Sequence, residues 1–295
     1  MTTKDVEPGT DLAGSGTLAD LPDLLRRAPG TADLDVYHPS QTPGFDGDKA
    51  AGAKALAALA DPLADLQERL FAAGRSGDGR RVLVILQGTD TSGKGGTVRA
   101  VGGLLDPQGI VVRAFGRPTA EEQRHDFLWR IEQALPPAGR IGFFDRSHYE
   151  DVLAARVRGL VSGAEVDRRH AAIEEFEHRL VEGGTTLLKI MLRISPEEQR
   201  ERLLARLDNP AKHWKLDDGD LDDRDRWADY DAAYAAVLRR CSGAAPWYVV
   251  PADRKWYRNL AVARLLQATL EGLDLEWPTA SVDVEAMRQR LLAED

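Results

Sequence analysis

The chain has 295 residues, of which 43% are hydrophobic and 29% charged, and its formal net charge is −9. This composition suffices for one large α/β domain or two small ones and excludes an extended disordered chain. The acidic balance argues against general binding of nucleic acid, and no apolar run reaches the ~18 residues of a membrane span. A single cysteine and an N-terminus without a secretory pattern lead us to expect a cytoplasmic protein with no nucleic-acid or membrane partner.

Helix and strand patterns alternate along most of the chain. Apolar residues at helical spacing predict a helix over 49–73. Apolar runs predict five buried strands, at 82–87, 110–115, 141–145, 185–194 and 247–253. Further helices are expected over 93–105, 119–135 and 165–182, and from about 149, 195 and 257 onward. This alternation predicts an α/β protein, with a parallel sheet covered by helices on both faces.

The strongest functional signal is the segment 88–97, GTDTSGKGGT, which follows the first strand and opens a helix. It contains the G-x-x-x-x-G-K pattern of a phosphate-binding loop in the required strand–loop–helix context. Glycines let backbone N–H groups converge on phosphate oxygens, and Lys94 would supply a positive charge to the phosphoryl group. The expected phosphate-binding residues of the loop are Gly88, Ser92, Gly93, Gly95, Gly96 and Thr97. A glycine-rich turn without a ligand is the alternative interpretation.

Gly95 stands where most such loops carry the Ser or Thr that contacts Mg²⁺. A metal ion must therefore find other oxygens, and we expect Asp90 and Asp145 to provide them for Mg²⁺, with Mn²⁺ as a second choice. Asp145 ends an apolar strand, where a second metal-binding carboxylate usually lies. Each aspartate could instead cap a turn or a helix.

Charged residues continue directly after Asp145. Arg146 would act as a phosphate clamp on the same rim of the sheet. Glu150 and Asp151 could reach a ribose hydroxyl, a base amine or a metal-bound water, and we include them as nucleotide-binding candidates. They could equally be solvated acids at the start of a helix.

A basic, proline-interrupted segment follows the helix that starts at Ser195. Arg202 and Arg206 are four residues apart and share a helical face, and Lys212 and Lys215 follow them. This pattern predicts a mobile lid over phosphates at about 206–227, with a plain surface loop as the alternative. Residues 1–47, rich in Gly, Pro, Thr and Asp, predict an N-terminal arm that is partly mobile, and 274–295 form a C-terminal tail.

Five segments together resemble the second family of polyphosphate kinases. They are GTDTSGKGGTVRAV (88–101), RPTAEEQRHDFLWR (117–130), FFDRSHYEDVL (143–153), NPAKHWK (209–215) and APWYVVPADRKWYRNL (245–260). The similarity extends from about Thr42 to Leu270. It implies a three-layer αβα P-loop kinase domain over 48–273, similar to thymidylate kinase, with a helical lid. It also implies Mg²⁺-dependent phosphate transfer between inorganic polyphosphate and AMP, ADP or ATP, with guanine nucleotides as further substrates.

The resemblance also assigns roles by motif position. Asp90 and Asp145 would hold the metal and orient the acceptor phosphate, while Lys94 and Arg146 would stabilise the transferring group. The basic residues expected to line a channel for the polymer are Arg117, Arg206, Lys212 and Lys215. At Glu150 the sequence resembles family members that use AMP as well as ADP, so we expect this chain to accept both nucleotides. Some such members, however, carry Asp at the position of Gly95. The resemblance further implies that the protein assembles as a homodimer or homotetramer.

Transfer would be in line, without a covalent enzyme intermediate, through positioning and charge neutralisation. Two other functions fit a phosphate-binding loop. An ATP-dependent kinase of a nucleotide or small metabolite would require ATP and ignore polyphosphate. A nucleotide-binding switch would bind nucleotide tightly without transfer, although the chain has no Asn/Thr-Lys-x-Asp motif for reading a guanine base.

Overall fold

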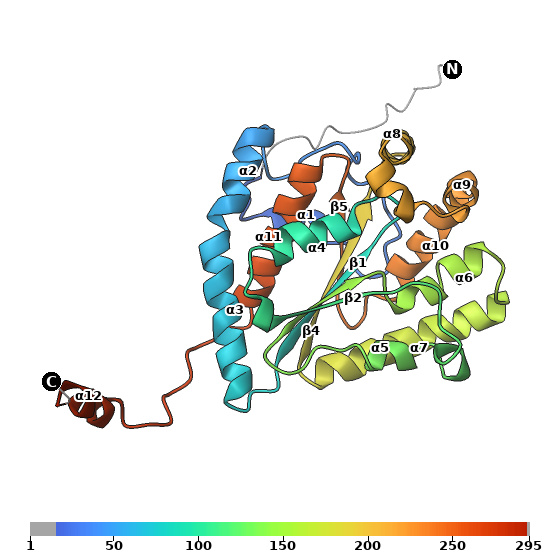
Figure 1. Cartoon of the computed structure of the whole chain (residues 1–295). Helices are drawn as coiled ribbons and strands as arrows, with labels where there is room; N and C mark the ends of the chain where they lie inside the picture. The colour runs from blue at the N-terminus through green and yellow to red at the C-terminus, as the bar shows by residue number, and fades with distance from the viewer. Residues whose placement is uncertain (1–15, 294–295) are drawn as a thin grey trace, which may run out of the picture.

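The computed structural model describes residues 16–293 and contains one five-stranded sheet whose strands are all parallel (Figure 1). The strands lie in the order β2-β3-β1-β4-β5. Their bounds are β1 (Arg81–Gln87), β2 (Ile110–Ala114), β3 (Ile141–Asp145), β4 (Thr185–Arg193) and β5 (Trp247–Pro251). The α/β fold with a parallel sheet is therefore confirmed, with strands where the apolar runs predicted them.

Helices cover both faces of this sheet. The α-helices are α1 (Leu21–Leu25), α2 (Lys49–Ala58), α3 (Ala60–Arg75), α4 (Lys94–Gly102), α5 (Trp129–Glu132), α6 (Ala154–Val157), α7 (Gly163–Glu182), α8 (Pro196–Leu207), α9 (Gly219–Asp225), α10 (Trp227–Arg240), α11 (Lys255–Glu271) and α12 (Val284–Leu292). Short 3-10 helices are η1 (Pro107–Gly109), η2 (Glu122–Arg124), η3 (His148–Asp151) and η4 (Pro210–Lys215).

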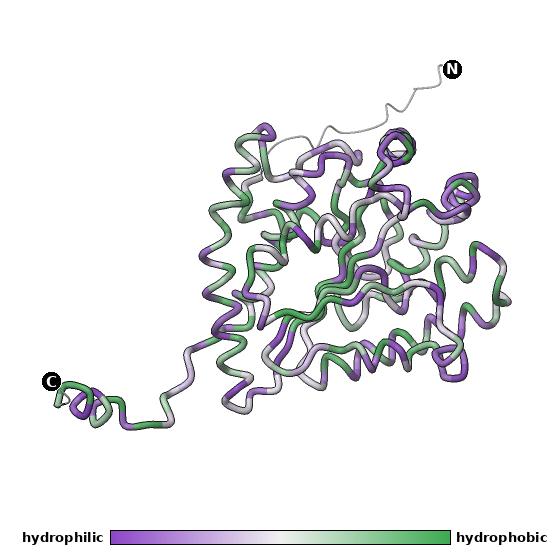
Figure 2. The backbone as a smooth tube through the Cα atoms, in the orientation of Figure 1, coloured by the Kyte–Doolittle hydropathy of each residue, from purple (hydrophilic) through white to green (hydrophobic). Residues whose placement is uncertain are grey.

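The core is divided into two layers by the sheet. Successive residues of β1 point to opposite faces, so Val82 and Val84 pack with α3, α4 and α11, while Leu83 and Ile85 pack with α7 and α10. Because both faces are buried, the central strand is apolar from Val82 to Leu86, which is why its sequence shows no alternation. Figure 2 shows the same arrangement, with hydrophobic strands at the centre and hydrophilic stretches on the outer helices. The three-layer αβα architecture is thus confirmed.

Several helix predictions need correction. The helix expected over 119–135 is broken into η2 and α5, because the Asp126 carboxylate accepts a hydrogen bond from Leu128 N at 3.0 Å and starts a new turn. The capping pair at its start is present, with Glu122 N donating to Thr119 Oγ1 at 3.2 Å. The helix expected over 49–73 is divided at Leu59, and the one from 149 is η3 followed by α6. In contrast, Ser195 caps α8 as predicted, accepting from Glu198 N at 3.1 Å.

The two ends of the described chain differ in their packing. Leu21 and Leu25 of α1 are fully buried in the core, and Arg27 N donates to Trp247 O at 2.8 Å. Residues 1–15 of the expected N-terminal arm lie outside the described range. Helix α12 projects from the body at the end of an extended segment (Figure 1), and none of its residues is buried. Within residues 16–293, no helix combines the length and the apolar character needed to cross a membrane.

Candidate active site

The site lies at the carboxyl edge of the sheet, where β1 and β3 end side by side. Leu86 of β1 is in register with Asp145 of β3, so the loop after β1 and the segment after β3 leave the sheet together. From β1 the chain crosses to β2 on one side, while β4 pairs with β1 on the other. Ligands of open α/β sheets bind at such a reversal of strand order, next to the carboxyl ends of the strands.

The loop between β1 and α4 depends on glycine for its backbone. Gly93, the N-cap of α4, has φ +100°. A Cβ atom at this position would lie 1.7 Å from Arg258 Nη1. The first backbone bond of α4 runs from Thr97 N to Gly93 O at 2.9 Å, so the N–H groups of the preceding residues have no partner within the helix. Ser92 is fully buried, and its Oγ has no hydrogen-bond partner within residues 16–293. These groups form a cradle suited to an anion.

The variant Gly93→Ala tests this backbone. We expect it to lose activity, because an alanine would adopt an unfavourable positive φ and also displace the Arg258 guanidinium. Thermal unfolding and turnover should be measured together, with Gly77→Ala as the control. Gly77 also has a positive φ, but a Cβ there meets no atom within 4 Å. Equal losses of activity in both variants would contradict the expectation.

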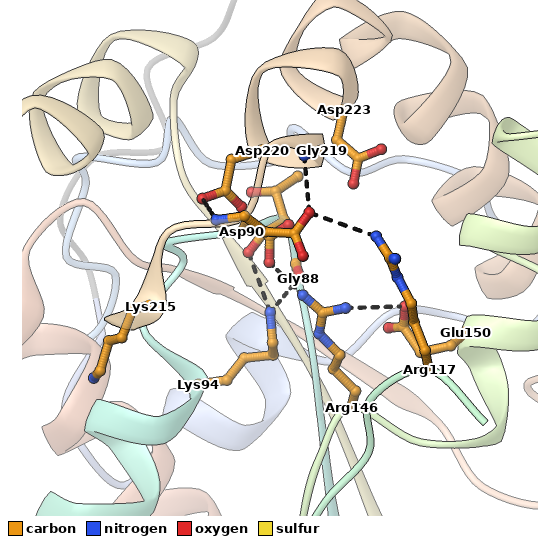
Figure 3. A network of polar contacts seen from close by, with 12 residues as sticks. Gly88, Asp90, Lys94, Arg117, Arg146, Glu150, Lys215, Gly219, Asp220 and Asp223 are labelled. Carbon is orange, nitrogen blue, oxygen red and sulfur yellow. Dashed lines mark hydrogen bonds and ion pairs between the residues drawn. The ribbon is translucent and has the colours of Figure 1, made fainter. Parts of the chain in front are cut away.

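Lys94 lies across the mouth of the loop (Figure 3). Its side chain is 6% exposed, and Nζ donates to Gly88 O at 2.8 Å and to Thr89 O at 3.2 Å. Burial and the positive charge of Arg146 lower the pKa of Lys94, and nearby carboxylates only partly oppose this shift. The ammonium group is therefore poorly solvated and suited to an incoming anion.

Arg146 joins two carboxylates beside Lys94. Its Nη2 donates to Asp90 Oδ1, and its Nη1 lies 3.7 Å from Glu150 Oε2 (Figure 3). Burial raises the pKa of Asp90, but the charges of Arg146, Lys94 and Arg206 outweigh it, so the net pKa is lowered. The pKa of Glu150, in contrast, is raised by burial. The pKa of Arg146 is raised, first by Glu150 and also by Asp90, so it carries a permanent positive charge.

Asp145 lies close to the start of α4. A Cβ added to Gly95 would be 3.2 Å from Asp145 Oδ2, so glycine lets the helix approach this carboxylate. Within residues 16–293 no group of three or more His, Cys, Asp or Glu side chains could hold a metal ion. Mg²⁺ at phosphate sites commonly takes only one or two carboxylates, with water and substrate oxygens completing its shell. Asp90 and Asp145 at the loop fit this mode of binding.

The side chains of Asp151 and Glu150 contact different neighbours, although the two residues are adjacent in the sequence. Its carboxylate accepts from Arg130 Nη2 at 3.0 Å and lies 3.4 Å from Arg169 Nη1, so it ties η3 to α5 and α7. Burial raises the pKa of Asp151, while Arg130 and Arg169 act against this shift. Glu150 instead faces Gln87, whose amide donates to Glu150 Oε1 at 3.0 Å in the orientation that satisfies both of its groups.

Arg206 begins the segment 206–227 that the sequence predicts to be a lid, and it binds other residues of that segment. Its Nη1 donates to Lys215 O at 3.0 Å and to Asp220 Oδ2 at 3.1 Å. Arg117, which is 79% exposed, lies 3.6 Å from Asp217 and so bridges from the β2 side to the lid. Lys215 packs against Trp214 and points away from the group around Asp90 (Figure 3), and Lys212 is exposed. These basic residues are spread along the rim rather than gathered around Lys94.

Two arginines contact the loop that the sequence did not assign to the site. Arg202 Nη1 donates to Thr91 O at 2.8 Å and to Ser92 O at 3.1 Å. Arg258 Nη1 donates to Ser92 O at 3.3 Å. The four-residue spacing of Arg202 and Arg206 was visible in the sequence, but nothing local indicates that Arg202 turns toward the loop.

A parallel sheet with a glycine loop after β1, a buried lysine and a carboxylate at the end of β3 defines the class of P-loop phosphotransferases. Within this class, residues 46–277 match the polyphosphate kinase 2 family, and the chain belongs to it. The resemblance seen in the five sequence segments is thereby confirmed.

Two relatives and one solved structure define the similarity further. The AMP/ADP-polyphosphate phosphotransferase of Meiothermus ruber is 47% identical over 250 residues, covering 84% of this chain and 92% of the relative. The ADP-polyphosphate phosphotransferase of Rhodopseudomonas palustris is 39% identical, covering 78% of this chain and 84% of the relative. The crystal structure of polyphosphate kinase 2 from Arthrobacter aurescens TC1 is 51% identical, with a TM-score of 0.88, and covers 95% of this chain and 97% of that one.

Proposed function

We propose that this enzyme transfers phosphate between inorganic polyphosphate and nucleotides and that it accepts both AMP and ADP. The observation that carries the proposal is the cradle after β1, with buried Lys94 at its mouth and the Asp90–Arg146 pair beside it. The relative from Meiothermus ruber is named for both acceptors. Glu150, held between Arg146 and Gln87, supports the wider acceptor range that its motif suggests.

The chain's own groups act by positioning and by neutralising charge. Lys94 and Arg146 bring two positive charges to the group in transfer, and the free N–H groups at the start of α4 bind its oxygens. The Asp90 carboxylate orients Arg146, so the guanidinium is aligned before substrate enters. No protein nucleophile is needed, because a terminal oxygen of the nucleotide phosphate attacks the end of the polymer in line.

A phosphotransferase of this family works with a divalent metal ion, and we propose that it is Mg²⁺, with Mn²⁺ able to replace it. Asp90 and Asp145 would hold it, and when bound it would supply positive charge to the phosphate oxygens. We further propose that Arg117, Arg206, Lys212 and Lys215 guide the polymer along the rim. Guanine nucleotides as substrates, a homodimeric or homotetrameric state and a cytoplasmic location complete the proposal.

The deciding experiment supplies purified protein with Mg²⁺, long-chain polyphosphate and either AMP or ADP, and separates the nucleotides by chromatography. We expect ADP to form from AMP and ATP from ADP, each only with polyphosphate. Asp145→Asn should lower both rates by about 10²-fold or more, because one of the two carboxylates proposed to hold the metal ion loses its charge. Asp167→Asn is the matched control, since Asp167 pairs with Arg240 on the exposed face of α7.

Each other result has a defined meaning. Formation of ATP from ADP without any use of AMP would contradict the acceptor range but not the transfer. Transfer from ATP with none from polyphosphate would contradict the donor. Tight nucleotide binding with no transfer from either donor would contradict the conclusion that the protein is an enzyme and would favour a nucleotide-binding module.

A further inference from the structure

The Arg202 side chain donates hydrogen bonds to several backbone carbonyls. From α8, its Nη1 donates to Thr91 O and Ser92 O in the glycine loop, as described above. Its Nη2 donates to Ala252 O at 2.7 Å and Asp253 O at 2.8 Å, just after β5. Its Nε donates to Glu198 Oε1 at 2.6 Å one turn earlier in α8. One side chain therefore ties together α8, the loop after β1 and the segment after β5.

Arg258 approaches the same loop from α11. Its Nη1 shares the Ser92 carbonyl with Arg202, and its guanidinium occupies the space that side chains at Gly93 and Gly96 would fill. Burial, followed by the positive charge of Arg202, lowers the pKa of Arg258 to about 10. Two cations are thus held near each other against the outside of the loop, and carbonyl dipoles together with the Glu198 carboxylate compensate their charge.

These bonds determine which way the peptide groups of the loop face. A trans peptide is planar, with its C=O and the following N–H on opposite sides. Because the Ser92 carbonyl faces the two guanidinium groups, the N–H of Gly93 faces the opposite way, into the cradle. Thr91 has φ +64°, which is unfavourable for a β-branched residue and needs surrounding contacts to persist. Arg202 supplies such a contact at the Thr91 carbonyl.

We propose that Arg202 and Arg258 are positioning residues that set the phosphate-binding conformation of the loop, and that Arg202 couples this loop to the lid. The coupling runs along α8, because Arg206, one turn after Arg202, contacts the lid at Lys215 O and Asp220. Neither arginine touches the reacting atoms. The expected change in kcat rests on the proposed function, whereas the expected change in phosphate binding does not.

The test uses Arg202→Lys and Arg258→Lys in the full chain. Lysine keeps the positive charge but loses the planar fork, with which Arg202 reaches four carbonyls and Arg258 reaches Ser92 O and Asn259 Oδ1 at once. We expect kcat to fall about 10- to 100-fold, since small misplacements of binding groups have effects of this size. The KM for the nucleotide should change less than the KM for polyphosphate. Guanidinium ion added to Arg202→Ala should restore part of kcat, which a general loss of stability would not allow.

Arg264→Lys is the matched control. Arg264 lies on the same helix as Arg258, donates to Leu18 O at 3.2 Å and pairs with Glu271, on the side of α11 that faces the N-terminal segment. Its kcat and both KM values should equal those of the wild type. Thermal unfolding of every variant should be recorded, so that a loss of folded protein is separated from a loss of positioning.

Binding of tripolyphosphate, measured by calorimetry, tests the phosphate-binding conformation of the loop without requiring turnover. We expect both lysine variants to bind it about tenfold more weakly. Wild-type kcat with wild-type binding in Arg202→Lys and Arg258→Lys would overturn the inference. So would unfolding of both variants, because the arginines would then be determinants of the fold alone. If the wild type binds tripolyphosphate but transfers nothing from polyphosphate, the proposed function fails while the binding comparison still decides this inference.

Discussion

Replacing Lys94 by alanine is expected to lower kcat by about 10²- to 10³-fold, the cost of removing one preorganised charge from a reacting phosphate. The lysine is buried, and its partners Gly88 O and Thr89 O are neutral carbonyls, so its charge is not cancelled by a direct ion pair. Its interaction with the substrate should strengthen as charge develops in transfer. The effect should therefore appear mainly in kcat and less in either KM.

Rates with saturating polyphosphate and ADP measure this effect, with Lys54→Ala on the exposed face of α2 as control. The pH dependence of the activity should also change in a defined direction. Because the pKa of Lys94 is lowered by burial, its charge is lost at a lower pH than that of an exposed lysine, and activity should decline correspondingly early on the alkaline side. A Lys94→Ala variant with unchanged kcat would remove this residue from the proposed chemistry.

The second large effect concerns stability rather than catalysis. Lys189 of β4 and Glu177 of α7 are both fully buried, with Nζ 2.5 Å from Oε2. Lys189 also donates to Cys241 O at 2.8 Å, and Tyr149 donates to Glu177 Oε1 at 2.6 Å. Replacing Lys189 by methionine leaves the Glu177 carboxylate buried without its cation. We expect the free energy of unfolding to fall by about 3–5 kcal/mol, as measured by urea denaturation.

The control for this prediction lies on the same helix. Glu175 pairs with Arg179 at 3.3 Å, but both side chains are exposed, so Glu175→Gln should change stability by less than about 0.5 kcal/mol. The double variant Lys189→Met with Glu177→Leu removes both charges and should recover much of the loss. A Lys189→Met protein as stable as the Glu175→Gln protein would show that the buried pair contributes little.

The features that the sequence predicted correctly are governed by local rules. A strand covered on both faces favours a continuous apolar run, and β1, apolar from Val82 to Leu86, is recognisable on that ground alone. Ser195 and Pro196 satisfy the requirements of a helix start whatever lies around them. The loop at 88–93 is equally local, because glycine is needed wherever the backbone takes a positive φ beside a ligand.

The features that escaped prediction depend on distant partners. Arg202 and Arg258 reach the Ser92 carbonyl across 110 and 166 residues of sequence, and no periodicity encodes such a contact. Asp151 follows Glu150 directly, yet its orientation is decided by Arg130 and Arg169 on α5 and α7. The break in the expected helix over 119–135 is an exception with a local cause, because the Asp126 side chain accepts a hydrogen bond from Leu128 N two residues later.

The position of β1 in the sheet has a mechanical consequence. Because β1 lies between β3 and β4, the loop it carries is anchored in the most constrained part of the molecule. Arg117 follows the edge strand β2, and it contacts the predicted lid through an exposed ion pair with Asp217. Under the proposed function, breaking that contact would widen the entrance for a long polyanion, while the N–H groups at the start of α4 would keep their positions. On this proposal the reaction centre is rigid and the entrance is flexible.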